Sequence, residues 1–145
     1  SIIYLKIKMN YNTMESETQK TLKQLFCTQL IEFMDDILTI FPNNLDLKTG
    51  KTFIIGLTKV SKKKLVGIWK TSVVDVYENE IMNGDKEYFI NKDYKEDLGE
   101  GGTDKMMSVI EDVRKLMRKT TEENKNKAMK YLQNLTKICK LYYAN

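Results

Sequence analysis

The densest group of side chains that could carry chemistry lies in residues 89–104, which read FINKDYKEDLGEGGTD. A calcium-binding EF-hand loop needs oxygen ligands at positions 1, 3 and 5, glycine at position 6 and glutamate at position 12. Counted from Asp93, these requirements fail at Lys95, Leu98 and Asp104. The same acids would repel a phosphate group. We therefore interpret the segment as a glycine-rich hinge between two helices, with an acidic docking surface for a basic partner as the alternative.

The chain contains no histidine. This excludes Ser-His-Asp and Cys-His catalytic groups, Glu-x-x-His di-metal sites and histidine-containing zinc sites. Neither glycine-rich nucleotide-binding motif occurs. The sequence predicts no catalytic, cofactor-binding or metal-ligating residue. An enzyme that uses carboxylates alone is the third hypothesis, and it needs a cleft that brings Glu32 or Asp36 against another acid.

The two cysteines, Cys27 and Cys139, lie far apart and form no Cys-x-x-Cys pair. We predict buried, unreactive thiols and a reducing intracellular setting, since nothing in their number or spacing indicates a disulfide scaffold. No stretch of about 18 apolar residues, the length needed to cross a bilayer, is present. The sequence therefore indicates no contact with a membrane.

The chain has a net charge of +4, and its basic and acidic residues are concentrated in different segments. Residues 1–74 carry 11 basic and 6 acidic groups, residues 75–104 carry 3 and 10, and residues 105–145 carry 10 and 4. Lysine and arginine clusters can bind phosphates, which makes nucleic-acid binding the second functional hypothesis. A solvated lysine-rich face is the plainer interpretation. The residues for that hypothesis are Lys62, Lys63, Lys64, Arg114, Arg118 and Lys119.

Apolar residues recur at three- and four-residue spacing through most of the chain, which predicts amphipathic helices. The strongest pattern spans residues 16–41, with Ser16 as the capping residue and Pro42 beyond the end. Further helices are expected over 45–60, where a strand is the alternative, and over 62–83. A brief turn follows Asp85, another helix follows the acidic segment, and a last one starts near Glu122.

The opening residues alternate apolar and basic side chains, with Ile3, Leu5 and Ile7 on one side. This period of two is typical of a strand or an extended arm. Residues 1–13 thus form either an extended arm or an appendage to a domain that covers 14–145. An extended arm can add a strand to the exposed sheet edge of a partner.

Aromatic and acidic residues are interleaved at the start of the acidic segment, which is typical of a protein-contact patch. The alternative is that Phe89 and Tyr94 fold under the loop and join the core. The predicted contact patch comprises Tyr88, Phe89, Asp93, Tyr94 and Asp97.

Three segments carry a resemblance: FCTQLIEFMDDILTIFPNN, IWKTSVVDVYENEIMNGDKEYFINKDYKEDL and KAMKYLQNLTKICKLYY. They resemble a group of small helical proteins of unknown function that giant DNA viruses encode. The shared pattern is a helix ending in Ile-Phe-Pro, a Gly-Asp turn before Phe-Ile-x-x-Asp-Tyr, and a final Tyr-x-x-x-Leu-x-Lys helix. The resemblance implies a viral origin, and with it a location in the host cytoplasm or the virion. It carries no implication about activity.

Together these patterns predict an all-α protein, a compact antiparallel bundle of four to five helices with an extended N-terminal arm. The first functional hypothesis is non-enzymatic: a protein–protein interaction or virion-associated structural role, through a protein partner or self-association. No cofactor and no small-molecule substrate are expected.

Overall fold

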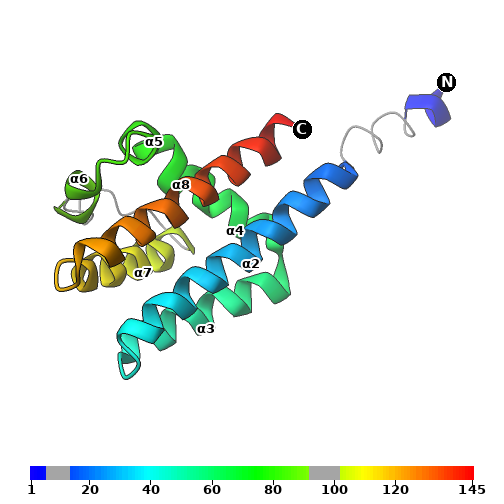
Figure 1. The fold of residues 1–145 in the computed structure, drawn as a ribbon. Helices are drawn as coiled ribbons and strands as arrows, with labels where there is room; N and C mark the ends of the chain where they lie inside the picture. The colour runs from blue at the N-terminus through cyan, green and yellow to red at the C-terminus, as the bar shows by residue number, and fades with distance from the viewer. Residues whose placement is uncertain (6–13, 92–101) are drawn as a thin grey trace.

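The computed structural model describes residues 1–5, 14–91 and 102–145. All regular structure in these ranges is helical, which confirms the all-α class. Seven α-helices and one π-helical segment follow a single helical turn at residues 2–5 (Figure 1). The elements are α2 (Glu17–Ile40), α3 (Leu45–Val60), α4 (Lys62–Trp69), η1 (Lys70–Val74), α5 (Asp75–Met82), α6 (Lys86–Asn91), α7 (Gly102–Met117) and α8 (Glu122–Ala144).

The helices begin where side chains can accept hydrogen bonds from free backbone N–H groups. Ser16 and Gln19 form the expected capping box at the start of α2. Asn44 caps α3 through a bond from the Leu47 N–H (3.0 Å), and Thr121 caps α8. Residues 45–60 therefore form a helix and not the alternative strand.

The helix count exceeds the expected four or five because the segment 62–83 is divided. A π-helical segment separates α4 from α5, and Gly84 then takes a positive φ of 71°, which ends α5. The predicted turn after Asp85 is a short helix, α6, in which the Asp85 carboxylate accepts from the Tyr88 N–H.

The π-helical segment changes which residues of this region face the core. Successive core residues lie four apart, and in a regular α-helix each such step would rotate the side chain by about 40°. The wider π turn offsets this rotation, so the row stays buried through five positions. The row consists of Leu65, Trp69, Val73, Tyr77 and Ile81.

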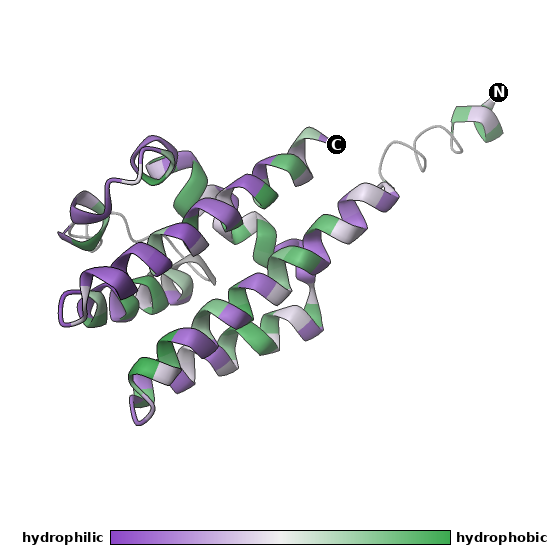
Figure 2. Cartoon of the chain, in the orientation of Figure 1, coloured by the Kyte–Doolittle hydropathy of each residue, from purple (hydrophilic) through white to green (hydrophobic). Residues whose placement is uncertain are grey.

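The first and last helices form the centre of the fold. α2 makes its most extensive contacts with α8, which runs antiparallel to it, and its next most extensive contacts with α3 (Figure 1). Phe33 of α2 stacks on Tyr131 of α8 at 4.9 Å between ring centroids, and Phe26 packs edge-on against Trp69 at 5.7 Å. Purple (hydrophilic) and green (hydrophobic) residues alternate along α2 and α8 in Figure 2, as expected for helices with one apolar side.

The predicted extended conformation of the N-terminal arm is not found in the part that is described. Residues 2–5 form one helical turn, in which the Leu5 N–H donates to the Ser1 carbonyl (3.0 Å). The Ser1 hydroxyl accepts from the Tyr4 N–H (3.2 Å), as a capping residue does. Ile3 and Leu5 are exposed there, while Ile7 lies outside the described residues.

Candidate nucleic-acid interface

A single residue, Ser61, joins α3 to α4 and creates a sharp corner. Its N–H donates to the Leu57 carbonyl at the end of α3 (2.8 Å), and its hydroxyl accepts from the Lys64 N–H in α4 (3.1 Å). Because Ser61 ends one helix and caps the next, the lysines on both sides of it are held together. We call Lys59, Lys62, Lys63 and Lys64 the lysine corner.

The lysine corner concentrates positive charge at the surface, and the charge of Lys63 also acts on the Glu15 carboxylate. Lys59, Lys63 and Lys64 are exposed and Lys62 is partly exposed. None of the ion pairs between described residues involves a lysine of this corner. Lysines in the first turn of a helix also oppose the helix dipole, which favours acids there. This arrangement works against the stability of α4.

A shallow, open depression of about 470 Å³ lies between the lysine corner and the end of α8. Its lining includes Lys63, Lys64 and Gly67 of α4 and Tyr143 of α8. A Cβ atom at Gly67 would lie 3.3 Å from the Tyr143 hydroxyl, so glycine allows the close approach of α4 and the tyrosine. We call this the lysine–tyrosine groove.

Tyr143 is available at the surface and lies beside Lys70. Its side chain is 46% exposed, and the Lys70 ammonium group lies 5.9 Å from its ring centroid. Its ring meets that of Tyr142 edge-on, with 5.1 Å between centroids. An exposed aromatic ring beside lysines can stack on a base while the lysines hold phosphates.

Polar contacts fix the end of α8 against the start of α2, next to the groove. The Gln19 side chain donates to the Tyr142 carbonyl (3.1 Å), and the Tyr142 hydroxyl donates to Glu15. Burial works to raise the pKa of Glu15, but hydrogen bonds from Lys23 and Tyr142 and the charge of Lys63 hold it below its usual value. Burial and the bond to Glu15 raise the pKa of Tyr142. Glu15 is thus an ionised carboxylate that accepts hydrogen bonds from Lys23 and Tyr142.

The second basic cluster lies far from the groove. Arg118 and Lys119 are exposed just before α8, whereas Tyr143 is near the other end of that 23-residue helix. A helix of this length spans about 33 Å. The structure therefore does not bring the two predicted clusters together.

Arg114 is a correction to the predicted nucleic-acid residues. Its side chain is 5% exposed, and it donates to the Ile90 carbonyl (2.8 Å) and to Glu111 (2.8 Å from Nε). The guanidinium group holds α7 against the end of α6, and it is not available to a phosphate.

Phe89 is a correction to the predicted contact patch. It is 7% exposed and packs edge-on against Tyr77, with 5.7 Å between ring centroids, so it belongs to the core. The alternative interpretation, that it folds inward, is correct. Tyr88 is 38% exposed. Asp93, Tyr94 and Asp97 lie outside the described residues.

The carboxylates of α2 bind neighbouring side chains. Asp35 pairs with Lys51 of α3, and the Tyr131 hydroxyl donates to Asp36, which together with burial raises the pKa of Tyr131 to about 12. Glu32 is exposed. In the described ranges, no group of three or more acids, cysteines or histidines is arranged to hold a metal ion.

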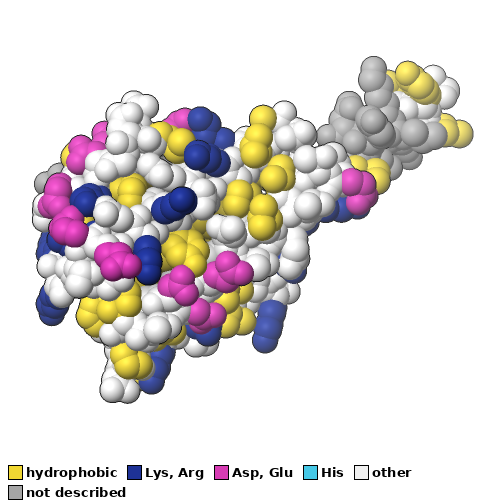
Figure 3. Space-filling model, viewed as in Figure 1, with side chains coloured by type: hydrophobic (Ala, Val, Ile, Leu, Met, Phe, Trp, Pro, Cys, Tyr) yellow, Lys and Arg dark blue, Asp and Glu magenta, His cyan; other side chains and the backbone are white. Residues whose placement is uncertain are grey.

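Surface charges are more mixed in space than along the sequence. Lys86 pairs with Glu122 (2.7 Å), and Lys140 pairs with Glu78. On the face shown in Figure 3, basic and acidic side chains lie beside one another over its left part. None of the helices in the described ranges is both long and apolar enough to cross a membrane.

The sequence analysis did not identify Tyr143 as a site residue. The signal was present, because Tyr142 lies on the inward stripe of the last helix and the next residue must then point outward. No protein-family model, no curated protein and no solved structure matches the chain. The resemblance to giant-virus proteins stays a prediction.

Proposed function

We propose that the protein is a non-enzymatic binding protein whose lysine–tyrosine groove holds single-stranded nucleic acid. The observation that carries the proposal is the shared groove of Lys63, Lys64 and Tyr143, with no carboxylate among its lining residues. Phosphate contacts supply most sequence-independent affinity, and an aromatic platform adds base stacking.

Single strands fit this groove better than duplexes do. A strand with unpaired bases can present a base face to Tyr143 while its backbone follows the lysine corner. A duplex hides those faces in its stack.

The first test is a fluorescence anisotropy titration of a labelled single strand of about 16 nucleotides. A duplex of the same sequence is titrated in parallel, each at roughly 50 and 200 mM salt. We expect saturable binding of the single strand that weakens steeply with salt, and weaker binding of the duplex. No binding of the single strand at the lower salt concentration would refute the proposal.

Paired variants then locate the site. Lys63→Ala with Lys64→Ala removes two phosphate contacts and should reduce the slope of log affinity against log salt by about 1.4. The matched control is Arg118→Ala with Lys119→Ala, which removes the same charge at the other end of α8 and should leave the slope nearly unchanged. Equal losses in both pairs would indicate a general effect of net charge and contradict the groove.

The tyrosine is tested separately from the charges. Tyr143→Leu removes the stacking platform and should lower single-strand affinity about tenfold. Tyr143→Phe keeps the ring and should bind nearly as the unmodified protein does. If both variants bind equally well, the tyrosine does not stack on a base.

A further inference from the structure

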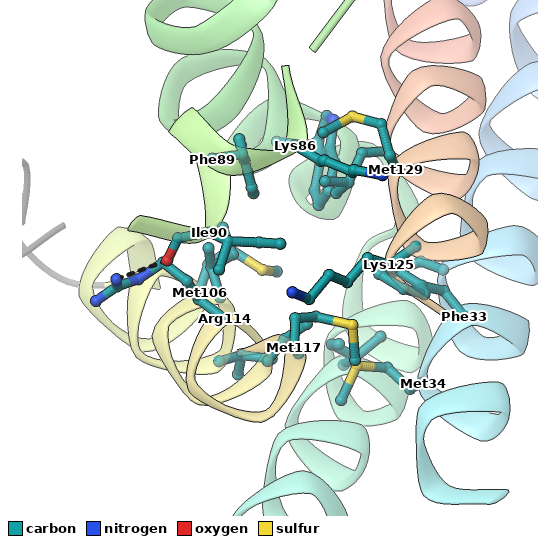
Figure 4. Close-up of a pocket in the computed structure, with 18 residues that line it drawn as sticks. Phe33, Met34, Lys86, Phe89, Ile90, Met106, Arg114, Met117, Lys125 and Met129 are labelled. Carbon is teal, nitrogen blue, oxygen red and sulfur yellow. Dashed lines mark hydrogen bonds between the residues drawn. The ribbon is translucent and has the colours of Figure 1, made fainter. Parts of the chain in front are cut away.

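The helices enclose an apolar cavity of about 50 Å³ at the junction of α2, α6, α7 and α8 (Figure 4). It shares no residue with the lysine–tyrosine groove. Three aromatic and four methionine side chains provide much of its wall. These residues are Phe33, Met34, Trp69, Phe89, Met106, Met117 and Met129.

The methionine wall makes this cavity adaptable. Methionine is unbranched and has three rotatable side-chain bonds, so it can follow the shape of a ligand better than Leu or Ile can. An engineered apolar cavity of about 150 Å³ binds benzene. A cavity with about a third of that volume has room for only one or two carbon atoms, so an alkyl chain enters it only when the methionines rearrange.

Two lysines place positive charge at the edge of this apolar cavity. Lys86, at the start of α6, and Lys125, in the first turn of α8, both line the cavity. In Figure 4 the Lys125 ammonium group points into the space between α7 and α8. The Lys125 side chain is 15% exposed and that of Lys86 26%, so both charges are partly withdrawn from water.

The two ammonium groups share one carboxylate. Glu122 lies 2.7 Å from Lys86 Nζ and 3.3 Å from Lys125 Nζ, so among the described residues two positive charges at the cavity edge share one negative charge. Trp69 also lines the cavity, and its indole N–H has no acceptor among the described residues, although the side chain is 2% exposed. A ligand carboxylate at the two ammonium groups would supply the second negative charge.

We propose that the cavity binds a short alkyl carboxylate, with its carboxylate at Lys86 and Lys125 and its chain among the methionines. The charge at the edge selects an anionic head group, and the apolar wall selects an alkyl chain. Two lysine stems that merely cover an imperfectly packed core would show neither preference.

The test uses the methionine methyl groups of the full chain as NMR probes during a titration with hexanoate. Four of them line the cavity, while Met14, Met82 and Met107 do not and serve as internal references. We expect the lining methyl signals to shift and saturate with hexanoate. Acetate, which has the head group without the longer chain, and hexylammonium, which has the chain with a cationic head group, should give at least tenfold weaker effects.

Variants then test the head-group contact. Lys125→Met should weaken hexanoate binding at least tenfold, and the matched control Lys127→Met, an exposed lysine on the same helix, should not change it. The comparison of hexanoate with hexylammonium needs no variant, so it decides the matter even if Lys125→Met does not fold. Equal saturation by both ligands, or no saturable shift of the lining methyl groups, would overturn the proposal.

Discussion

The thiols of Cys27 in α2 and Cys139 in α8 are both shielded from water. They are 3% and 0% exposed, and the Cys139 Sγ lies 3.7 Å from the Val66 carbonyl oxygen as a hydrogen-bond donor. Burial raises the pKa of Cys27 to about 11 and that of Cys139 to about 12. Both thiols therefore stay protonated in the folded protein under conditions where an exposed thiol ionises.

The difference between the thiol pKa values in the folded and unfolded protein predicts a loss of stability at alkaline pH. The raised pKa values favour the folded state fully below the unfolded thiol pKa, and the advantage is lost as pH rises toward the folded values. Above about pH 8.5 each thiol should lower the free energy of unfolding by about 1.4 kcal/mol per pH unit. Urea denaturation at increasing pH measures the slope. The Cys27→Ala, Cys139→Ala double variant should show a shallower slope, and an equal slope would contradict the assignment.

One residue-level prediction failed, and for another residue the sequence left two alternatives. Arg114 was expected at the surface, where charged residues usually lie, and Phe89 either in a contact patch or folded into the core. The structure buries both, and Arg114 is buried because Glu111 and the Ile90 carbonyl bind its guanidinium group. Such a partner 24 residues away in the chain leaves no mark in local spacing. Lys62, Lys63 and Lys64 were located correctly because their position depends only on the Ser61 cap next to them.

At the scale of elements, the two glycines of α3 have opposite surroundings. A Cβ atom at Gly56 would meet nothing within 4 Å, whereas one at Gly50 would lie 3.2 Å from both Val109 γ-methyl groups. Gly50 therefore permits the close approach of α3 and α7. Gly56 only lowers the helical propensity of an exposed position.

Alanine substitutions should separate these roles. Gly56→Ala should raise the free energy of unfolding by about 0.8 kcal/mol, because alanine is the better helix former. Gly50→Ala gains the same propensity but must displace Val109, so it should be less stable than Gly56→Ala. Urea denaturation of the two variants measures the difference. A Gly50→Ala variant at least as stable as Gly56→Ala would show that α3 and α7 are not closely packed there.

Helix positions were predictable to within a residue or two wherever a capping residue marks the start. The apolar spacing of residues 62–83 also predicts the buried row Leu65, Trp69, Val73, Tyr77 and Ile81, but it wrongly places Val76 inward with them. In the structure Tyr77 is 1% exposed and Val76 is 50% exposed, since the π segment shifts the register before them. A π turn depends on tertiary packing, and the sequence pattern has no signature for it.

At the scale of the whole molecule, the buried residues form one continuous cluster that draws on helices α2 to α8. Leu30 of α2 and Leu135 of α8 belong to it and are 3% and 0% exposed. The packing of helices from both ends of the chain predicts that the described helices unfold together, as small single domains usually do.

Truncations in either helix should affect one shared transition. Leu30→Ala and Leu135→Ala should each lower the free energy of unfolding by about 2–5 kcal/mol. Circular dichroism and the fluorescence of the single tryptophan, Trp69, should report the same midpoint in each variant. The control Leu141→Ala, at a side chain 53% exposed, should change stability by less than about 0.5 kcal/mol. Separate midpoints for the two probes would show that the helices unfold in parts.

The pairing of α2 with α8 also sets an order of events during synthesis. Translation produces α2 long before α8, so α8 cannot cover the apolar side of α2 until translation is nearly finished. This side includes Leu30, Phe33 and Ile37. Until then a nascent chain exposes this side to other chains, a condition that favours aggregation. While residues 41–144 are being translated, the part of this side that α8 later covers is therefore most open to contact with other chains.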